Sequence, residues 1–308
     1  MIFLPYKLDT SINRLPILTL LVCILCVFVY WQQYSIDKDH SKAVEKFCYD
    51  NIDKGAIAFL RKIARTESGN QCPEIFQAIR TAPNTQLKIE ELSKEAIPST
   101  LFSSNADNLK YVHNRLTELF KQYDSTVPKS LTSTLAYDPK NPSFKKMLTS
   151  TFSHADIIHL AGNLLFFYIF AASVEIIVGG FVFSIFVLVT SVGTSLAYSH
   201  SLFGIESTLP TIGLSGVVMA AMTALAVMLP TIKIRCFFWF LVYIRVFRIP
   251  ALSLAAWYIG WDIYGMKQAG NDSYINYVAH VSGAIIGGVL GIFCIFFRKE
   301  TLNKAIAG

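Results

Sequence analysis

Six stretches of this chain are apolar over lengths that can cross a lipid bilayer, and they limit its fold more than any other feature. They lie at residues 15–31, 157–178, 181–202, 209–229, 249–266 and 274–297. A spanning helix needs about 20 predominantly apolar residues. Because only helices and closed barrels satisfy the backbone in hydrocarbon, the pattern predicts an all-α membrane protein with six spanning helices.

Charge is concentrated between the first two apolar stretches. Residues 35–148 contain 17 of the 27 Lys/Arg and 14 of the 21 Asp/Glu, whereas only 16% of the whole chain is charged and 53% is hydrophobic. A soluble protein has about 25% charged residues. We therefore expect a large, helical, extramembrane insert between helices 1 and 2. The predicted parts are a tail with the first helix at 1–34, the insert at 35–147, a core of helices 2–6 at 148–298 and a second tail at 299–308.

The first apolar stretch is predicted to be an uncleaved membrane helix. A cleaved signal peptide is the alternative, but its apolar region would be about 7–15 residues long and followed by small residues. Here the stretch is followed by Tyr30-Trp31-Gln32-Gln33-Tyr34, which is typical of an anchor at the membrane interface.

The segment 231–248 is aromatic and apolar but interrupted by basic residues, which predicts a helix lying in the membrane interface.

Basic residues outside the insert predict the orientation of the chain in the membrane. With a cytoplasmic N-terminus, only Lys267 lies on the outer side. The nine on the inner side are Lys7, Arg14, Lys233, Arg235, Arg245, Arg248, Arg298, Lys299 and Lys304. This asymmetry predicts cytoplasmic N- and C-termini in a multi-pass protein, with a bacterial inner membrane as the expected location.

Polar side chains lie at similar depth in three of the predicted helices. His159, Ser215 and His280 each come a few residues after the outer end of helix 2, 4 or 6, which places all three about 10 Å below the outer surface. Polar groups in hydrocarbon are costly and are often functional. We therefore expect the three helices to share one polar site.

The residue types in this layer fit nucleophilic catalysis. Ser215, with Gly213 and Gly216 beside it, would be the nucleophile, and His280 its base. His159 and Asn163 are four residues apart and share a helical face, so both could donate to an oxyanion. Each has a structural alternative: Ser215 bonded to its own helix, His280 bonded to a buried carbonyl, and His159 with Asn163 in a hydrogen bond that joins helices.

Other assignments for these residues are a metal site and a third catalytic member. His154, His159 and His280 could supply nitrogen ligands, but no metal is expected because no suitable Cys, Asp or Glu accompanies them. Glu175 is too deep to orient His280, and Asp262 is expected to cap or anchor its own helix. The sequence thus predicts a Ser/His dyad.

With these motifs in hand, the chain resembles the rhomboid family of intramembrane serine proteases. The motifs that match, in the family's order, are His154-x4-His159-x3-Asn163, Gly213-x-Ser215-Gly216 and Ala279-His280-x2-Gly283. The resemblance implies catalysis by Ser215 and His280, an oxyanion hole of His159, Asn163 and the Ser215 amide, and a supporting role for His154. It also implies that Glu175 is a structural residue closing helix 2. Met219 stands where the family usually has an aromatic residue stacked on the histidine.

The resemblance implies cleavage of membrane-anchored proteins near the outer face, without a cofactor or a nucleic-acid partner. A non-catalytic rhomboid-like protein that binds membrane helices in quality control is the alternative, and Met219 supports it. A transporter would predict internal repeats and polar residues at the midplane, which the sequence does not show. The substrate, the oligomeric state and the role of the insert stay open.

Two cysteines, Cys48 and Cys72, lie in the insert, on the predicted outer face. A disulfide between them is one of two open interpretations, since that face is oxidising. Cys23, Cys26, Cys236 and Cys294 are expected to be apolar filler.

Overall fold

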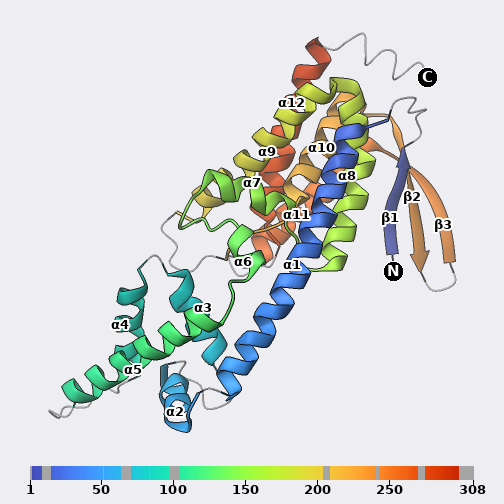
Figure 1. Ribbon diagram of the computed structural model, residues 1–308. Helices are drawn as coiled ribbons and strands as arrows, with labels where there is room; N and C mark the ends of the chain where they lie inside the picture. Colours follow the sequence, from blue (N-terminus) through green and yellow to red (C-terminus); the bar gives the residue numbers. More distant parts are fainter. Residues whose placement is uncertain are drawn as a thin grey trace. The chain divides into compact units, whose positions relative to one another are not determined.

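The computed structural model describes residues 2–8, 15–50, 52–63, 71–82, 84–96, 105–203, 209–240, 243–269 and 275–297 (Figure 1). The chain forms two compact units. The first comprises Met1–Gln33 with Thr132–Gly308, and the second comprises Tyr34–Leu131. The second unit is thus shorter than the predicted insert, because residues 132–147 belong to the first unit. The predicted tail at 299–308 lies outside the described residues.

The first unit is built mainly from apolar helices. Its elements include α1 (Ile17–Asp50, which continues into the second unit), α6 (Leu131–Leu135, whose first residue lies in the second unit), α7 (Phe144–Phe152), α8 (Ile157–Val178), α9 (Gly180–Ser201), α10 (Ser215–Met228), α11 (Ala251–Ala269) and α12 (Tyr277–Phe297). Among the described residues, α1, α8, α9 and α12 are long and apolar enough to cross a membrane. The shorter α10 and the less apolar α11 do not meet that standard, so six spans remains a prediction.

Helix α10 lies at the centre of the bundle and contacts α8, α9, α11 and α12. Small residues let α12 approach it closely. A Cβ added to Gly283 would overlap the carbonyl oxygen of Gly216, and one added to Gly287 would overlap that of Ala220. Without a hydrophobic driving force between helices in lipid, such close backbone packing supplies much of the attraction. The glycines of α12 therefore set its distance from α10.

Glu175, near the end of α8, binds the start of α1. Its carboxylate accepts the backbone N–H groups of Leu18 at 3.0 Å and Thr19 at 2.7 Å, and the Thr19 hydroxyl at 2.7 Å. The first amides of a helix lack partners within it and carry partial positive charge. A buried carboxylate is therefore stabilised at this position, and it joins α1 to α8.

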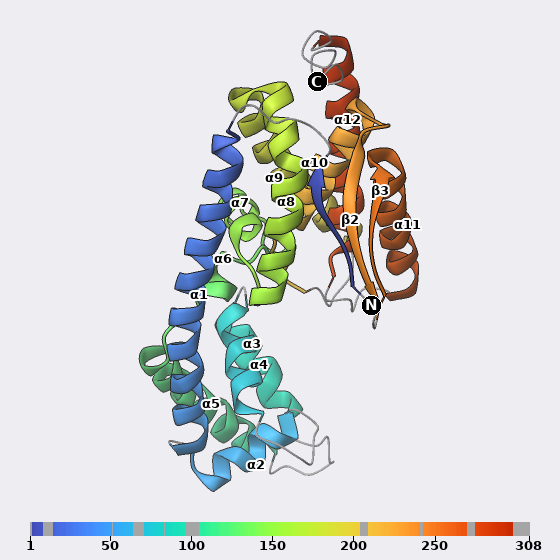
Figure 2. The same cartoon turned by 90° about the vertical axis from the view of Figure 1, so that its right-hand side faces the viewer.

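A three-stranded antiparallel sheet corrects two expectations, the all-α class and the interfacial helix at 231–248. Its strands, in the order β1-β2-β3, are β1 (Ile2–Leu8), β2 (Lys233–Phe240) and β3 (Tyr243–Pro250). Strand β1 packs against α8 and β3 against α11 (Figure 2). In β2, buried Ile234 and Cys236 alternate with more exposed Lys233 and Arg235, a period of two that fits a strand. The basic residues therefore mark the more exposed face of a strand and do not interrupt a helix.

The second unit is a small helical domain with its own core. It contains the end of α1 together with α2 (Lys54–Ile63), α3 (Cys72–Thr81), α4 (Thr85–Glu95) and α5 (Asn105–Thr126). Phe76 and Tyr123 stack with ring centroids 5.0 Å apart. Arg80 donates to the backbone oxygens of Tyr123 and Val127 at the end of α5, and the Val127 oxygen lies where a helix leaves its last carbonyls without an intrahelical partner. Residues that are distant in sequence thus form one folded core.

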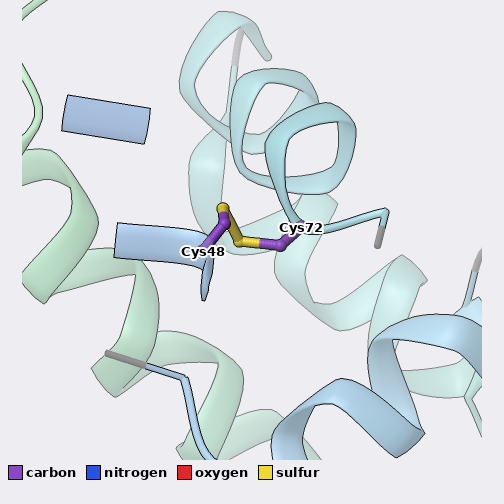
Figure 3. Close-up of a disulfide and its surroundings, with 2 residues drawn as sticks. All are labelled: Cys48 and Cys72. Carbon is purple, nitrogen blue, oxygen red and sulfur yellow. A yellow bond between two sulfur atoms is a disulfide. The ribbon is translucent and has the colours of Figure 1, made fainter. Parts of the chain in front are cut away.

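A disulfide joins Cys48, near the end of α1, to Cys72 at the start of α3 (Figure 3). The two Cα atoms are 5.8 Å apart, and both side chains are fully buried. The disulfide that the sequence left open is therefore confirmed. A link across 24 positions restricts the unfolded chain and is expected to contribute about 3 kcal/mol to stability.

Candidate active site

Ser215 is the first residue of α10, directly after a glycine turn. The backbone N–H of Gly213 donates to the Ser150 carbonyl at 2.9 Å. Gly213 has φ of +126°, and a Cβ there would lie 2.9 Å from the His159 ring. Only glycine fits this conformation and this space without strain. The turn thus presents Ser215 at a helix start close to the His159 side chain.

Helix α8 brings His159 and Asn163 to the same turn. Asp156 caps the helix by accepting the N–H groups of Ile158 and His159, both at 2.8 Å. These bonds hold the pKa of the Asp156 carboxyl below its usual range. Asn163 is buried, and its Nδ2 has no hydrogen-bond acceptor among the described residues. A buried donor without a partner costs free energy, so this amide is suited to an acceptor that arrives only with substrate.

His280, in the first turn of α12, is held by a carboxylate. Its Nδ1 lies 3.1 Å from Oδ2 of Asp262 on α11, and both side chains are largely buried. This contact corrects two expectations, that Asp262 caps or anchors its own helix and that His280 has no carboxylate partner. The sequence contained the residue but not its partner, because 18 positions and a change of helix separate them.

The aromatic neighbour of His280 is Tyr277, from its own helix. Their ring centroids are 6.5 Å apart at 81°, an edge-on arrangement. The Tyr277 ring packs against Gly265 of α11, where a Cβ would overlap it. Met219 is buried in α10. His280 therefore has an aromatic neighbour in Tyr277, although Met219 stands where the family usually has the aromatic residue.

The starts of α10 and α12 meet beside Ser215 and His280. A Cβ on Gly216 would lie 3.3 Å from the Ala279 carbonyl oxygen. Among the described residues, however, no hydrogen bond joins the Ser215 hydroxyl to the His280 ring. Both groups are half-buried. The geometry thus brings the segments of Ser215 and His280 together, without a hydrogen bond between their side chains.

A polar bridge links the same two segments. Asn276 donates from Nδ2 to the Thr211 hydroxyl at 3.0 Å, while its Oδ1 accepts the Ala279 N–H at 2.9 Å. Asn276 lies four residues before His280, and Thr211 lies four residues before Ser215.

A small cavity lies next to this bridge, and Ser215 lines it together with other hydroxyl-bearing side chains. They are Ser150, Thr151, Thr194, Ser195 and Thr211.

His154 lies in the segment before α8 and is almost completely buried. Its ring is edge-on to the His159 ring, with centroids 5.2 Å apart. Neither ring nitrogen has a hydrogen-bond partner among the described residues. Burial, and next the neighbouring His159, lower the pKa of His154 to about 4. His154 is therefore neutral at pH 7.

In the described part of the chain, no three His, Cys, Asp or Glu side chains are grouped as metal ligands.

Comparison with known proteins identifies the family. The model of the rhomboid domain matches residues 141–297, just over half of the chain. This chain belongs to the rhomboid family. The match includes all of the candidate site residues, and with the apolar helices it makes this rhomboid an integral membrane protein.

Individual relatives also match a little over half of this rhomboid. The presenilin-associated rhomboid-like protein of mitochondria is 25% identical in Bos taurus over 187 residues and 26% identical in Mus musculus over 182. Each alignment covers 58% of this chain and 45% of the relative. The chloroplastic rhomboid-like protein 11 of Arabidopsis thaliana is 29% identical over 167 residues, or 54% of this chain and 58% of the relative. This rhomboid thus spans about half the length of the curated relatives that it matches.

Proposed function

We propose that this rhomboid is an intramembrane serine endopeptidase that cleaves membrane-anchored proteins near the outer face. The observation that carries the proposal is the orientation of His280 by Asp262, at the helix start that meets Ser215. A carboxylate on Nδ1 leaves Nε2 for the serine, as in other serine hydrolases. Family membership supports the same reaction class.

In the proposed mechanism, the Ser215 oxygen attacks the scissile carbonyl carbon while His280 Nε2 takes the hydroxyl proton. Asp262 accepts the Nδ1–H group and stabilises the imidazolium that forms. His280 then gives the proton to the leaving amine, and the peptide C–N bond breaks. Water, deprotonated by His280, hydrolyses the acyl ester and releases the serine. A substrate helix must unwind locally, because an intact helix pairs its carbonyls internally.

The negative charge that develops on the carbonyl oxygen needs donors in the same place. We assign this role to His159, Asn163 and the Ser215 backbone N–H. Gly213 allows the approach, since the space that its Cβ would fill lies 2.9 Å from the His159 ring and 3.7 Å from Asn163 Nδ2. Donors fixed in a site that excludes water stabilise such charge without reorganisation.

A second candidate function is binding of membrane helices without cleavage. Two observations favour it, the missing hydrogen bond between Ser215 and His280 among the described residues and the departure at Met219. In serine hydrolases this bond is often long before substrate arrives. A carboxylate that orients the imidazole is what a serine hydrolase requires of its base, so we place hydrolysis first.

A fluorophosphonate probe separates the two candidates. We expect the detergent-solubilised protein to be labelled, and Ser215→Ala and His280→Ala to remain unlabelled. An unlabelled wild type that still binds a transmembrane peptide would favour the binder. Labelling that persists in Ser215→Ala would exclude Ser215 as the nucleophile.

The topology and division of the chain are also proposals. We place both termini in the cytoplasm and the second unit on the outer side, because the basic residues outside residues 35–148 are asymmetric. A bacterial inner membrane fits this arrangement, whereas the names of the relatives place those proteins in mitochondria and chloroplasts. Protease accessibility of the second unit in sealed spheroplasts tests the orientation; protection from external protease would reverse it.

A further inference from the structure

Gln33 of α1 is buried and hydrogen-bonded on both sides of its carboxamide. Its Oε1 accepts the backbone N–H of His154 at 3.1 Å, and its Nε2 lies 3.3 Å from the His154 carbonyl oxygen. Nε2 also donates to the Thr132 hydroxyl at 2.7 Å. Only 2% of Gln33 is exposed. One side chain of α1 therefore pairs with both the backbone N–H and the carbonyl group of His154.

Among the described residues, packing positions the His154 ring. Both ring nitrogens lack hydrogen-bond partners among the described residues, and its ring contact is with His159. The backbone next to it leads directly to Asp156, which caps α8 and accepts the His159 N–H. A shift of the His154 backbone would therefore also shift Asp156 and the start of α8, which carries His159.

We infer that Gln33 is a positioning residue for the oxyanion side of the active site. It fixes the His154 backbone, which keeps the His154 ring against His159 and closed to water. This inference rests on the proposed function, because it assigns a role in the same site. Gln33 itself does not touch the reacting groups. A shift of about 1 Å in a catalytic donor can lower a rate by about 10²-fold, so a remote hydrogen bond is sufficient for a kinetic effect.

The contact also lies where the chain enters and leaves the second unit. Gln33 is the last residue of the first unit before Tyr34, and Thr132 is the first residue after Leu131. The hydrogen bond between Gln33 and Thr132 joins these two points within the first unit. Both covalent connections to the second unit therefore meet at the side chain that holds His154.

Gln33→Met tests the inference, since methionine has a similar length but makes no amide hydrogen bonds. Gln32→Met is the matched control, because Gln32 is the exposed neighbour on the same helix. The rate constant of fluorophosphonate labelling should fall about 10-fold to 10²-fold in Gln33→Met and stay unchanged in Gln32→Met. Thr132→Val removes only the hydroxyl and should have a smaller effect in the same direction, which keeps the test valid if Gln33→Met does not fold.

Titration of His154 separates positioning from simple stabilisation. In ¹³C-histidine NMR, with the signal assigned by loss in His154→Asn, we expect a pKa near 4 in the wild type. Entry of water in Gln33→Met should raise this pKa toward about 6.5. Lower thermal stability with unchanged labelling and an unchanged His154 pKa would overturn the inference. An unlabelled wild type would instead contradict the proposed function, and the titration would then decide the inference alone.

Discussion

The Nδ1 atom of His280 lies 3.1 Å from Oδ2 of Asp262, and this contact joins α12 to α11 at the candidate active site. The carboxylate is bound to Nδ1. The other ring nitrogen, Nε2, is the one that must accept the proton of Ser215. The arrangement favours one tautomer, with the proton on Nδ1 and a free lone pair on Nε2.

Asp262→Asn should therefore lower catalysis strongly. The amide can bind Nδ1 in the wrong tautomer and cannot stabilise the imidazolium, so we expect kcat to fall by about 10²-fold to 10⁴-fold. Fluorophosphonate labelling and cleavage of a fluorogenic transmembrane peptide both measure this loss. Tyr264→Phe, an exposed position on the same helix, is the control. Wild-type rates in Asp262→Asn would show that catalysis depends on Ser215 and His280 without Asp262.

Asn163→Ala should slow turnover with little effect on binding. Its unpaired Nδ2 is assigned to the oxyanion, which exists only in the transition state, so kcat should fall by about 10²-fold to 10³-fold while KM changes little. Ser173→Ala is the control, because Ser173 is also buried in α8 and its hydroxyl has no partner among the described residues. Unchanged kcat in Asn163→Ala would remove this amide from the mechanism.

Gly287→Ala should destabilise the bundle, and Gly288→Ala should not. A Cβ at Gly287 would overlap the backbone oxygen of Ala220, whereas one at Gly288 would have only Thr223 Cγ2 nearby, at 3.7 Å. Backbone cannot yield as a side chain does, so we expect a loss of about 1–3 kcal/mol for Gly287→Ala. Thermal unfolding in detergent measures both variants. Equal melting temperatures would show that α12 does not pack so closely on α10.

Cys48→Ser should destabilise the second unit. The broken disulfide restores entropy to the unfolded chain and should cost about 3 kcal/mol. Chemical denaturation of the full chain, with and without reductant, measures the change. Cys23→Ser is the control because Cys23 is a free cysteine of α1. Wild-type stability of Cys48→Ser in the absence of reductant would show that the link contributes nothing to stability.

Much of the site was predictable because its signals are local. The apolar stretch at 157–178 has the same bounds as α8, and Ser215, expected a few residues inside helix 4, is the first residue of α10. His159 and Asn163 were placed on one face by helical periodicity alone. The β2–β3 hairpin was missed because its alternating basic residues were interpreted as interruptions of a helix, and the pairing of β2 with β1, more than 200 positions away, has no local signal.

Hydropathy and helical periodicity were enough to identify α8 and α12 and the polar side chains that they carry, because both signals act over one element at a time. The contacts of Asp262 with His280, of Gln33 with the His154 backbone and of β1 with β2 became visible only in the folded chain. Each of these depends on the packing of two elements whose relative rotation no single segment encodes.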